Sequence, residues 1–86
     1  MNLTIDASAQ ARIQQTQAEE QNPNLKLRIF VSYKTAESVR FGFVFDENAT
    51  NDDTVVDSVI VENSAALLMN NATLTHDGRT YIVNLA

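Results

Sequence analysis

This sequence of 86 residues contains no cysteine, no tryptophan, one proline and two glycines. Without cysteine, the chain has no disulfide framework, no thiol nucleophile, and no thiolates for zinc or an iron–sulfur cluster. Two glycines leave little room for the glycine-rich loops that cradle phosphates. The sequence also lacks an apolar run of about 18–20 residues and the charged-then-apolar order of a signal peptide. We therefore expect a cytoplasmic protein that does not interact with membranes.

The charge balance is acidic, with eleven Asp and Glu against six Lys and Arg and a net charge of −5. That excess argues against nucleic-acid backbones and anionic membranes as main partners. A hydrophobic fraction of 44% with 20% charged residues is typical of a globular chain. The length predicts one domain, residues 1–86, with a thin core.

Apolar and polar residues alternate in two long segments, which is the pattern of half-buried strands. The clearest strands are 25–31 and 39–45. The second strand places Phe41, Phe43 and Phe45 on one face, and we predict that this aromatic face forms the centre of the core.

Two helices are predicted from capping residues and breakers. Asp6 is placed to accept a backbone N–H at the start of a helix over 7–21, which Pro23 terminates. Asn63 is placed to cap a short helix over 64–70.

Two hairpins are predicted where short turns separate β-branched runs. Asp57-Ser58 divides residues 54–61, and Asp77-Gly78 divides residues 72–83. The order of strand, helix, two strands, hairpin, helix and hairpin indicates an α+β fold with mainly antiparallel strands. The predicted core comprises Leu27, Ile29, Val31, Val39, Phe41, Phe43, Phe45, Ile60 and Leu67.

Residues 22–31, Asn-Pro-Asn-Leu-Lys-Leu-Arg-Ile-Phe-Val, resemble the first core strand of the HesB/IscA (A-type carrier) family of iron–sulfur assembly proteins. Phe41-Gly42 and Phe45-Asp46 match the aromatic-Gly and Phe-Asp pattern that follows this strand in the family. The resemblance covers roughly residues 2–83. It implies a curved, mainly antiparallel sheet or half-barrel with an N-terminal helix and a second short helix.

The sequence departs from this family at the cluster ligands. The family's first ligand cysteine falls on Ala36, and the glycines before it become Tyr33, Lys34 and Thr35. The family's C-terminal pair of cysteines is absent from this sequence, which ends at Leu85-Ala86. Because an alanine methyl donates nothing to iron, the resemblance implies no catalytic residue, no bound cofactor and no metal ligand in this chain.

Two functions are compatible with a family fold that lacks its ligands. The first is a non-catalytic binding or accessory protein linked to iron–sulfur cluster assembly. The alternative is a protein- or small-ligand-binding domain that kept the fold outside iron–sulfur metabolism.

Basic and aromatic side chains beside one another on the two central strands predict a protein-contact surface. Arg28 and Arg40 occupy outward-facing positions, and Phe30, Tyr33 and Lys34 lie next to them. Interfaces favour arginine together with aromatics, so we expect a protein partner, with iron–sulfur assembly proteins as candidates. The alternative interpretation is ordinary charge on a solvated face.

Two further features each have two interpretations. Residues 46–53 offer oxygen donors that suit Ca²⁺ or Mg²⁺, but they lack the glycine and distal glutamate of an EF-hand loop. A solvated acidic edge that deters strand pairing is the alternative.

His76 beside Asp77 is either a surface residue flanking a turn or part of a catalytic pair. No nucleophile is placed near it by the sequence, so we predict no enzyme.

Overall fold

The computed structural model describes all 86 residues, Met1–Ala86. Its elements, in chain order, are β1 (Asn2–Ile5), α1 (Ala7–Glu19), β2 (Lys26–Lys34), β3 (Val39–Asp46), β4 (Thr54–Val56), β5 (Val59–Val61), α2 (Asn63–Ala66), β6 (Asn71–His76) and β7 (Tyr81–Leu85).

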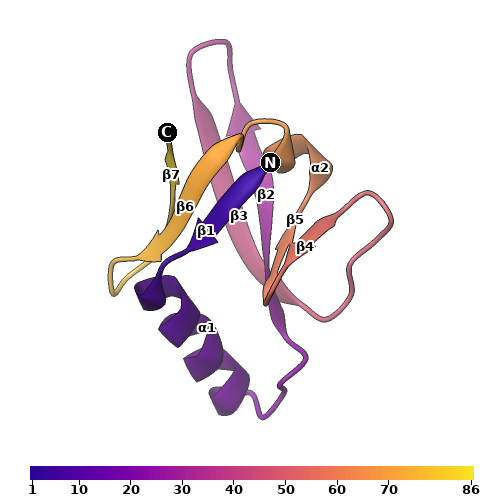
Figure 1. Ribbon diagram of the computed structural model, residues 1–86, viewed down its shortest axis with the longest axis vertical. Coiled ribbons are helices and arrows are strands. Elements are labelled where there is room, and N and C mark those ends of the chain that lie inside the picture. Colours follow the sequence, from indigo (N-terminus) through magenta and orange to yellow (C-terminus); the bar gives the residue numbers. More distant parts are fainter.

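The strands form two mixed sheets that pack against each other, with α1 across one end (Figure 1). One sheet has the order β1-β6-β7 and the other the order β3-β2-β5-β4. The pairs β1–β6 and β2–β5 are parallel, and the three hairpin pairs are antiparallel. The α+β class is thus confirmed, with two sheets rather than one mainly antiparallel sheet.

Asp6 caps α1 as the sequence predicts. Its carboxylate accepts the backbone N–H of Ser8 at 3.0 Å, an interaction that stabilises a helix by about 1 kcal/mol. Only Ala9 and Ile13 of α1 are buried, so few apolar contacts hold this helix. No helix is long and apolar enough to cross a membrane.

The centre of the core lies on the two inner strands of the larger sheet. Leu27 and Ile29 of β2 and all three residues of β5 are at most 1% exposed. All of these except Ile60 pack with α1, α2 and β6 in one cluster, which comprises Ala9, Ile13, Leu27, Ile29, Val59, Val61, Ala65, Met69, Ala72 and Leu74.

The prediction that the aromatic face forms the centre of this core is wrong. Phe41, Phe43 and Phe45 are only half-buried, as is Val39. The reason is strand order: β3 is an edge strand of its sheet, so its apolar side chains cover the margin of the core. Tyr81 of β7 completes this margin, with its ring centroid 5.7 Å from that of Phe43.

The prediction for the second helix is wrong in its extent. α2 is a single turn over Asn63–Ala66 with Glu62 at its N-cap. Ala65 and Met69 face the core, whereas Leu67 is 71% exposed. A single helical turn cannot bury a full apolar face. Because the helix ends at Ala66, the side chain of Leu67 lies outside the core.

Candidate functional site

The β2–β3 hairpin carries all five residues predicted for protein contact, and its tip projects beyond the two sheets (Figure 1). The pairing of β2 with β3 shifts register between Val31 and Tyr33, so that Tyr33 pairs with Arg40. Such a β-bulge inserts one residue and re-aims the side chains that follow it. As a result, Tyr33 and Arg40 lie on the same outer face as Phe30. We name this face, with Phe30, Tyr33, Arg40 and Val44, the hairpin face.

The hairpin face combines apolar surface with an unpaired positive charge. Tyr33 is 54% exposed and Val44 is 47% exposed. Arg40 makes no ion pair, because every salt bridge of the protein involves Arg28. Lys34 pairs with Val39 and is therefore placed on the opposite face of the same hairpin.

The tip of this hairpin, where the family resemblance places a ligand cysteine, is an ordinary turn. Thr35 accepts the backbone N–H groups of Glu37 and Ser38 on its hydroxyl at 3.3 and 3.1 Å. The backbone N–H of Thr35 donates to the carbonyl of Ser38 at 2.8 Å. Ala36 is exposed at the tip and offers only its methyl group, so position 36 supplies no thiolate to an iron–sulfur cluster.

Arg28 forms ion pairs within the protein, unlike Arg40 on the hairpin face. Its Nε donates to Asp46 at 3.1 Å, and its Nη1 donates to Asp53 at 2.9 Å and to Glu62 at 3.2 Å. Its Nη2 donates to the carbonyl of Asn48 at 2.7 Å. With only 11% of its side chain exposed, Arg28 lies beneath the loop between β3 and β4 and holds that loop on the sheet.

The charges of this cluster favour its ionised state. Backbone hydrogen bonds, from Thr50 to Asp53 and from Asn48 to Asp46, lower the pKa of each carboxyl, and Arg28 lowers both further. Burial disfavours the charged guanidinium, but the hydrogen bonds and charges of Asp53 and Asp46 outweigh it and raise the pKa of Arg28.

The acidic loop therefore already holds a cation, the guanidinium of Arg28. Asp53, with 5% of its side chain exposed, is not part of a solvated edge, whereas Asp52 is exposed. No group of three or more His, Asp or Glu side chains in the protein is arranged to hold a metal ion. Residues 46–62 contain six acids and no base. This excess of negative charge is the sequence signal that could have indicated an ion pair with a base elsewhere in the chain.

His76 does not form a catalytic pair with Asp77. Its Nδ1 accepts the backbone N–H of Gly78 at 3.0 Å, and its ring packs edge-on against Tyr81 with centroids 4.7 Å apart. Asp77 instead accepts the backbone N–H groups of Arg79 and Thr80. Both residues thus stabilise the β6–β7 turn, which agrees with the turn-flanking interpretation.

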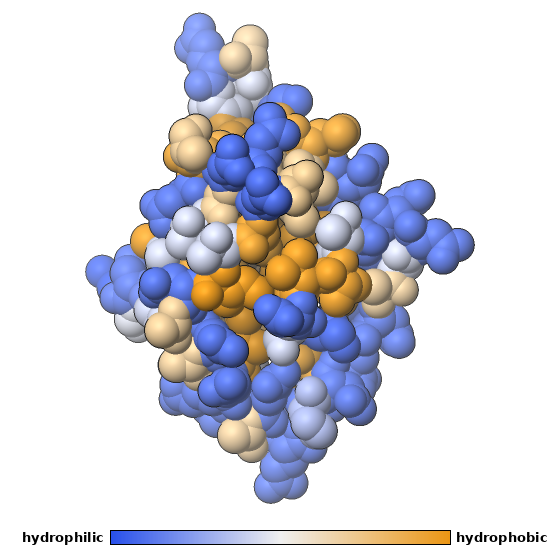
Figure 2. Space-filling model, viewed as in Figure 1, coloured by the Kyte–Doolittle hydropathy of each residue, from blue (hydrophilic) through white to orange (hydrophobic).

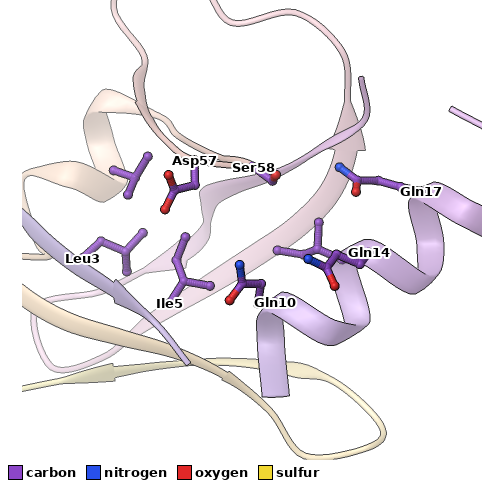
Figure 3. A pocket seen from close by; sticks show the side chains of 9 residues that line it. Leu3, Ile5, Gln10, Gln14, Gln17, Asp57 and Ser58 are labelled. Atoms are coloured by element: carbon purple, nitrogen blue, oxygen red, sulfur yellow. The ribbon is translucent and has the colours of Figure 1, made fainter. Parts of the chain in front are cut away.

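A cavity that the sequence did not indicate lies between α1, β1 and the turn joining β4 to β5. Figure 2 shows apolar surface gathered at the centre of this face and framed by hydrophilic side chains. The cavity has a volume of about 160 Å³, and Figure 3 shows side chains from all three elements around it. Its lining comprises Leu3, Ile5, Gln10, Ile13, Gln14, Gln17, Val56, Asp57 and Ser58.

Comparison with known sequences finds relatives among bacterial ErpA proteins. The ErpA protein of Bordetella pertussis is 43% identical over 60 residues, which are 70% of this chain and 49% of the relative. The iron–sulfur cluster insertion protein ErpA of Vibrio parahaemolyticus is 36% identical over 67 residues, 78% of this chain and 55% of the relative. The chain thus matches about half the length of these curated relatives. No family model matches it.

The fold is that of an A-type carrier. The crystal structure of Escherichia coli SufA, a protein involved in biosynthesis of iron–sulfur clusters, superposes with a TM-score of 0.57 at 22% identity. The match covers 98% of this chain and 83% of SufA. This chain is a homologue of the ErpA proteins of the HesB/IscA family over most of its length, and it shares its fold with SufA. That family is non-catalytic, and this homologue contains no cysteine.

Proposed function

We propose that this protein is a non-catalytic accessory component of iron–sulfur cluster assembly in the cytoplasm, which binds a protein partner and ligates no cluster itself. The observation that carries the proposal is the hairpin of the carrier fold. It keeps an exposed aromatic and basic face, while its tip has Ala36 where the family resemblance places a cysteine.

The hairpin face is the proposed contact surface. Tyr33 and Arg40 are of the residue types that most often dominate binding energy at interfaces. The bulge places them on one face with Phe30. Because Arg40 has no carboxylate partner within the protein, the partner surface that fits the hairpin face is acidic. Arg28 is a weaker candidate for partner contact than Arg40, since its guanidinium already donates hydrogen bonds to Asp46, Asp53, Glu62 and the carbonyl of Asn48.

Affinity capture from the source cells tests the partner. We expect the native chain to retain iron–sulfur assembly proteins, and a Tyr33→Ala/Arg40→Ala variant to bind them at least tenfold more weakly. Arg79→Ala is the matched control, because Arg79 is also exposed and unpaired but lies in the β6–β7 turn. Capture of no iron–sulfur protein by the native chain would contradict the proposal.

Reconstitution tests the second half of the proposal. After anaerobic incubation with ferrous iron and sulfide and removal of the excess, we expect a colourless protein without bound iron. Cluster absorption that stays with the isolated chain would show that ligands other than thiolates hold a cluster.

A second function, binding of a small ligand outside iron–sulfur metabolism, is supported by the cavity beside α1. The cavity lies between α1 and the β4–β5 turn and is thus distinct from the hairpin face. Its lining combines aliphatic side chains with amides and one carboxylate, the mixture that small-molecule sites use for affinity and orientation.

A further inference from the structure

The cavity beside α1 has an apolar floor formed by three elements. Leu3 and Ile5 come from β1, Ile13 from α1 and Val56 from β4. Its volume of about 160 Å³ is close to that of an engineered apolar cavity that accommodates benzene, about 150 Å³. A ligand of about six heavy atoms therefore fills it.

The rim of the cavity is polar, and most of its polar side chains form no hydrogen bond within the protein. The side chains of Gln10, Gln14 and Asp57 make no hydrogen bond within the protein, whereas Gln17 is held by the carbonyl of Leu25 at 2.8 Å. Figure 3 shows Asp57 and the two unpaired glutamines on opposite sides of the cavity, from the β4–β5 turn and from α1.

Three glutamines of α1 border the cavity, and Gln10 and Gln14 are exposed. Gln10, Gln14 and Gln17 follow the spacing of one helical face, next to the buried pair Ala9 and Ile13. Aliphatic residues at these positions would widen the narrow apolar stripe of α1 and hold the helix more firmly. The amides of Gln10 and Gln14 instead place hydrogen-bonding groups without internal partners beside the cavity.

Asp57 supplies the only charge in the lining. No basic side chain lines the cavity, and Asp57 forms no salt bridge. Its backbone has φ of 51°, a left-handed conformation that few residues other than Gly, Asn and Asp adopt readily. The turn thus accommodates a short acidic side chain where it borders an aliphatic floor.

We propose that this cavity binds a short aliphatic ammonium group, with its methylenes on the floor of Leu3, Ile5 and Ile13 and its nitrogen at Asp57. The amide oxygens of Gln10 and Gln14 accept further N–H bonds from the ammonium, which has three donors and no acceptor. The group is either a free alkylamine or the side chain of a lysine. This inference gives the second proposed function a ligand class and does not depend on the hairpin face.

Nuclear magnetic resonance of the ¹⁵N-labelled full chain tests the proposal, with n-butylammonium as the probe. We expect saturable shifts at the amides of Leu3, Ile5 and Ser58. Uncharged n-butanol should bind at least tenfold more weakly, because it cannot form the charge-assisted bond to Asp57. A parallel titration with N-acetyl-lysine methylamide compares a protein lysine with a free amine. Whichever of the two binds more tightly identifies the source of the group.

Asp57→Asn is the decisive variant, because asparagine also tolerates the left-handed backbone and keeps the turn. We expect it to weaken butylammonium at least tenfold, whereas Asp52→Asn, an exposed acid outside the cavity, leaves binding unchanged. The proposal is overturned if the native chain shows no saturable shift, or if butanol or the Asp57→Asn variant responds as strongly. Such a failure leaves the partner-capture result unaffected.

Discussion

The ring of Phe30 lies directly over Gly42, its partner on the neighbouring strand of the hairpin. A Cβ added at position 42 would overlap three atoms of that ring, all of them side-chain atoms of Phe30. The absence of a side chain at Gly42 is therefore what allows Phe30 to fold onto the sheet.

Replacing Gly42 with alanine should force the Phe30 ring away from β3. The atoms in the way are the tip of one half-buried side chain that can move, so we expect a loss of only about 1 kcal/mol, the low end for overpacking, in the free energy of unfolding in urea. The matched control is the double variant Phe30→Ala/Gly42→Ala, compared with Phe30→Ala alone. If Gly42→Ala lowers the free energy of unfolding as much in the Phe30→Ala background as in the native chain, contact with the Phe30 ring is not the cause of the loss.

Arg28→Ala should destabilise the protein through the carboxylates that it leaves unpaired. Loss of one partner of a buried pair costs about 3–5 kcal/mol, but Asp46 and Glu62 remain 41% and 38% exposed and can be solvated. We therefore expect a loss on the order of 2 kcal/mol in urea unfolding. Arg40→Ala, which removes an unpaired arginine on the same hairpin, should change stability by less than about 0.5 kcal/mol. Equal effects of the two variants would contradict an internal role for Arg28.

Acidification should weaken the fold through the carboxylates of the same cluster. The folded-state pKa values of Asp46 and Asp53 lie below their ordinary value of 3.8, owing to backbone hydrogen bonds and to Arg28. Stabilisation from these groups is therefore complete above about pH 4 and is lost as the pH falls through the folded-state pKa values.

Unfolding in urea, measured from pH 7 downward, checks this dependence. The turn and cap residues Asp6 and Asp77 also have a lowered pKa, through hydrogen bonds from Ser8 and Thr80 respectively, and they add to the slope. An Asp53→Asn variant should lose less stability than the native chain over the same acid range. An unchanged slope would mean that Asp53 does not contribute.

Calcium should produce no saturable change in the amide resonances of residues 46–53 in the native chain. The carboxylates of Asp46, Asp53 and Glu62 are already bound to Arg28, and a divalent ion would have to displace a guanidinium. In Arg28→Ala the three carboxylates lose the guanidinium and keep only the backbone N–H bonds from Asn48 and Thr50, and weak binding at millimolar Ca²⁺ is expected, as in low-affinity oxygen sites. Saturable shifts in the native chain would show that the loop opens.

Much of the fold could be predicted from local pattern. Asp6 caps α1, and the Asp57-Ser58 turn lies where short-range chemistry placed it. The last hairpin is also present, but its turn runs over residues 77–80 rather than over Asp77-Gly78 alone. The size of the second helix and the depth of Phe43 could not be predicted, because they depend on which strands are central. The pairing of β2 with β5 is parallel and non-local, and no local signal specifies it.

The candidate site divides in a similar way. The resemblance to A-type carriers and the absence of cysteine could be recognised in the sequence, and comparison with ErpA and SufA confirms the relationship. The sequence could not show whether Arg28 contacts a partner or an internal acid. The carboxylates that Arg28 binds are 18, 25 and 34 residues away along the chain. The cavity beside α1 likewise joins residues from three separate segments.

The amino-acid sequence alone determined the elements of this protein and the absence of thiolate chemistry, because strand alternation, helix capping and donor atoms are properties of residues close together or taken singly. Only the tertiary structure decided which charges are satisfied internally, which aromatic residues are exposed and where a cavity opens. Those properties depend on distances between segments that are brought together by packing.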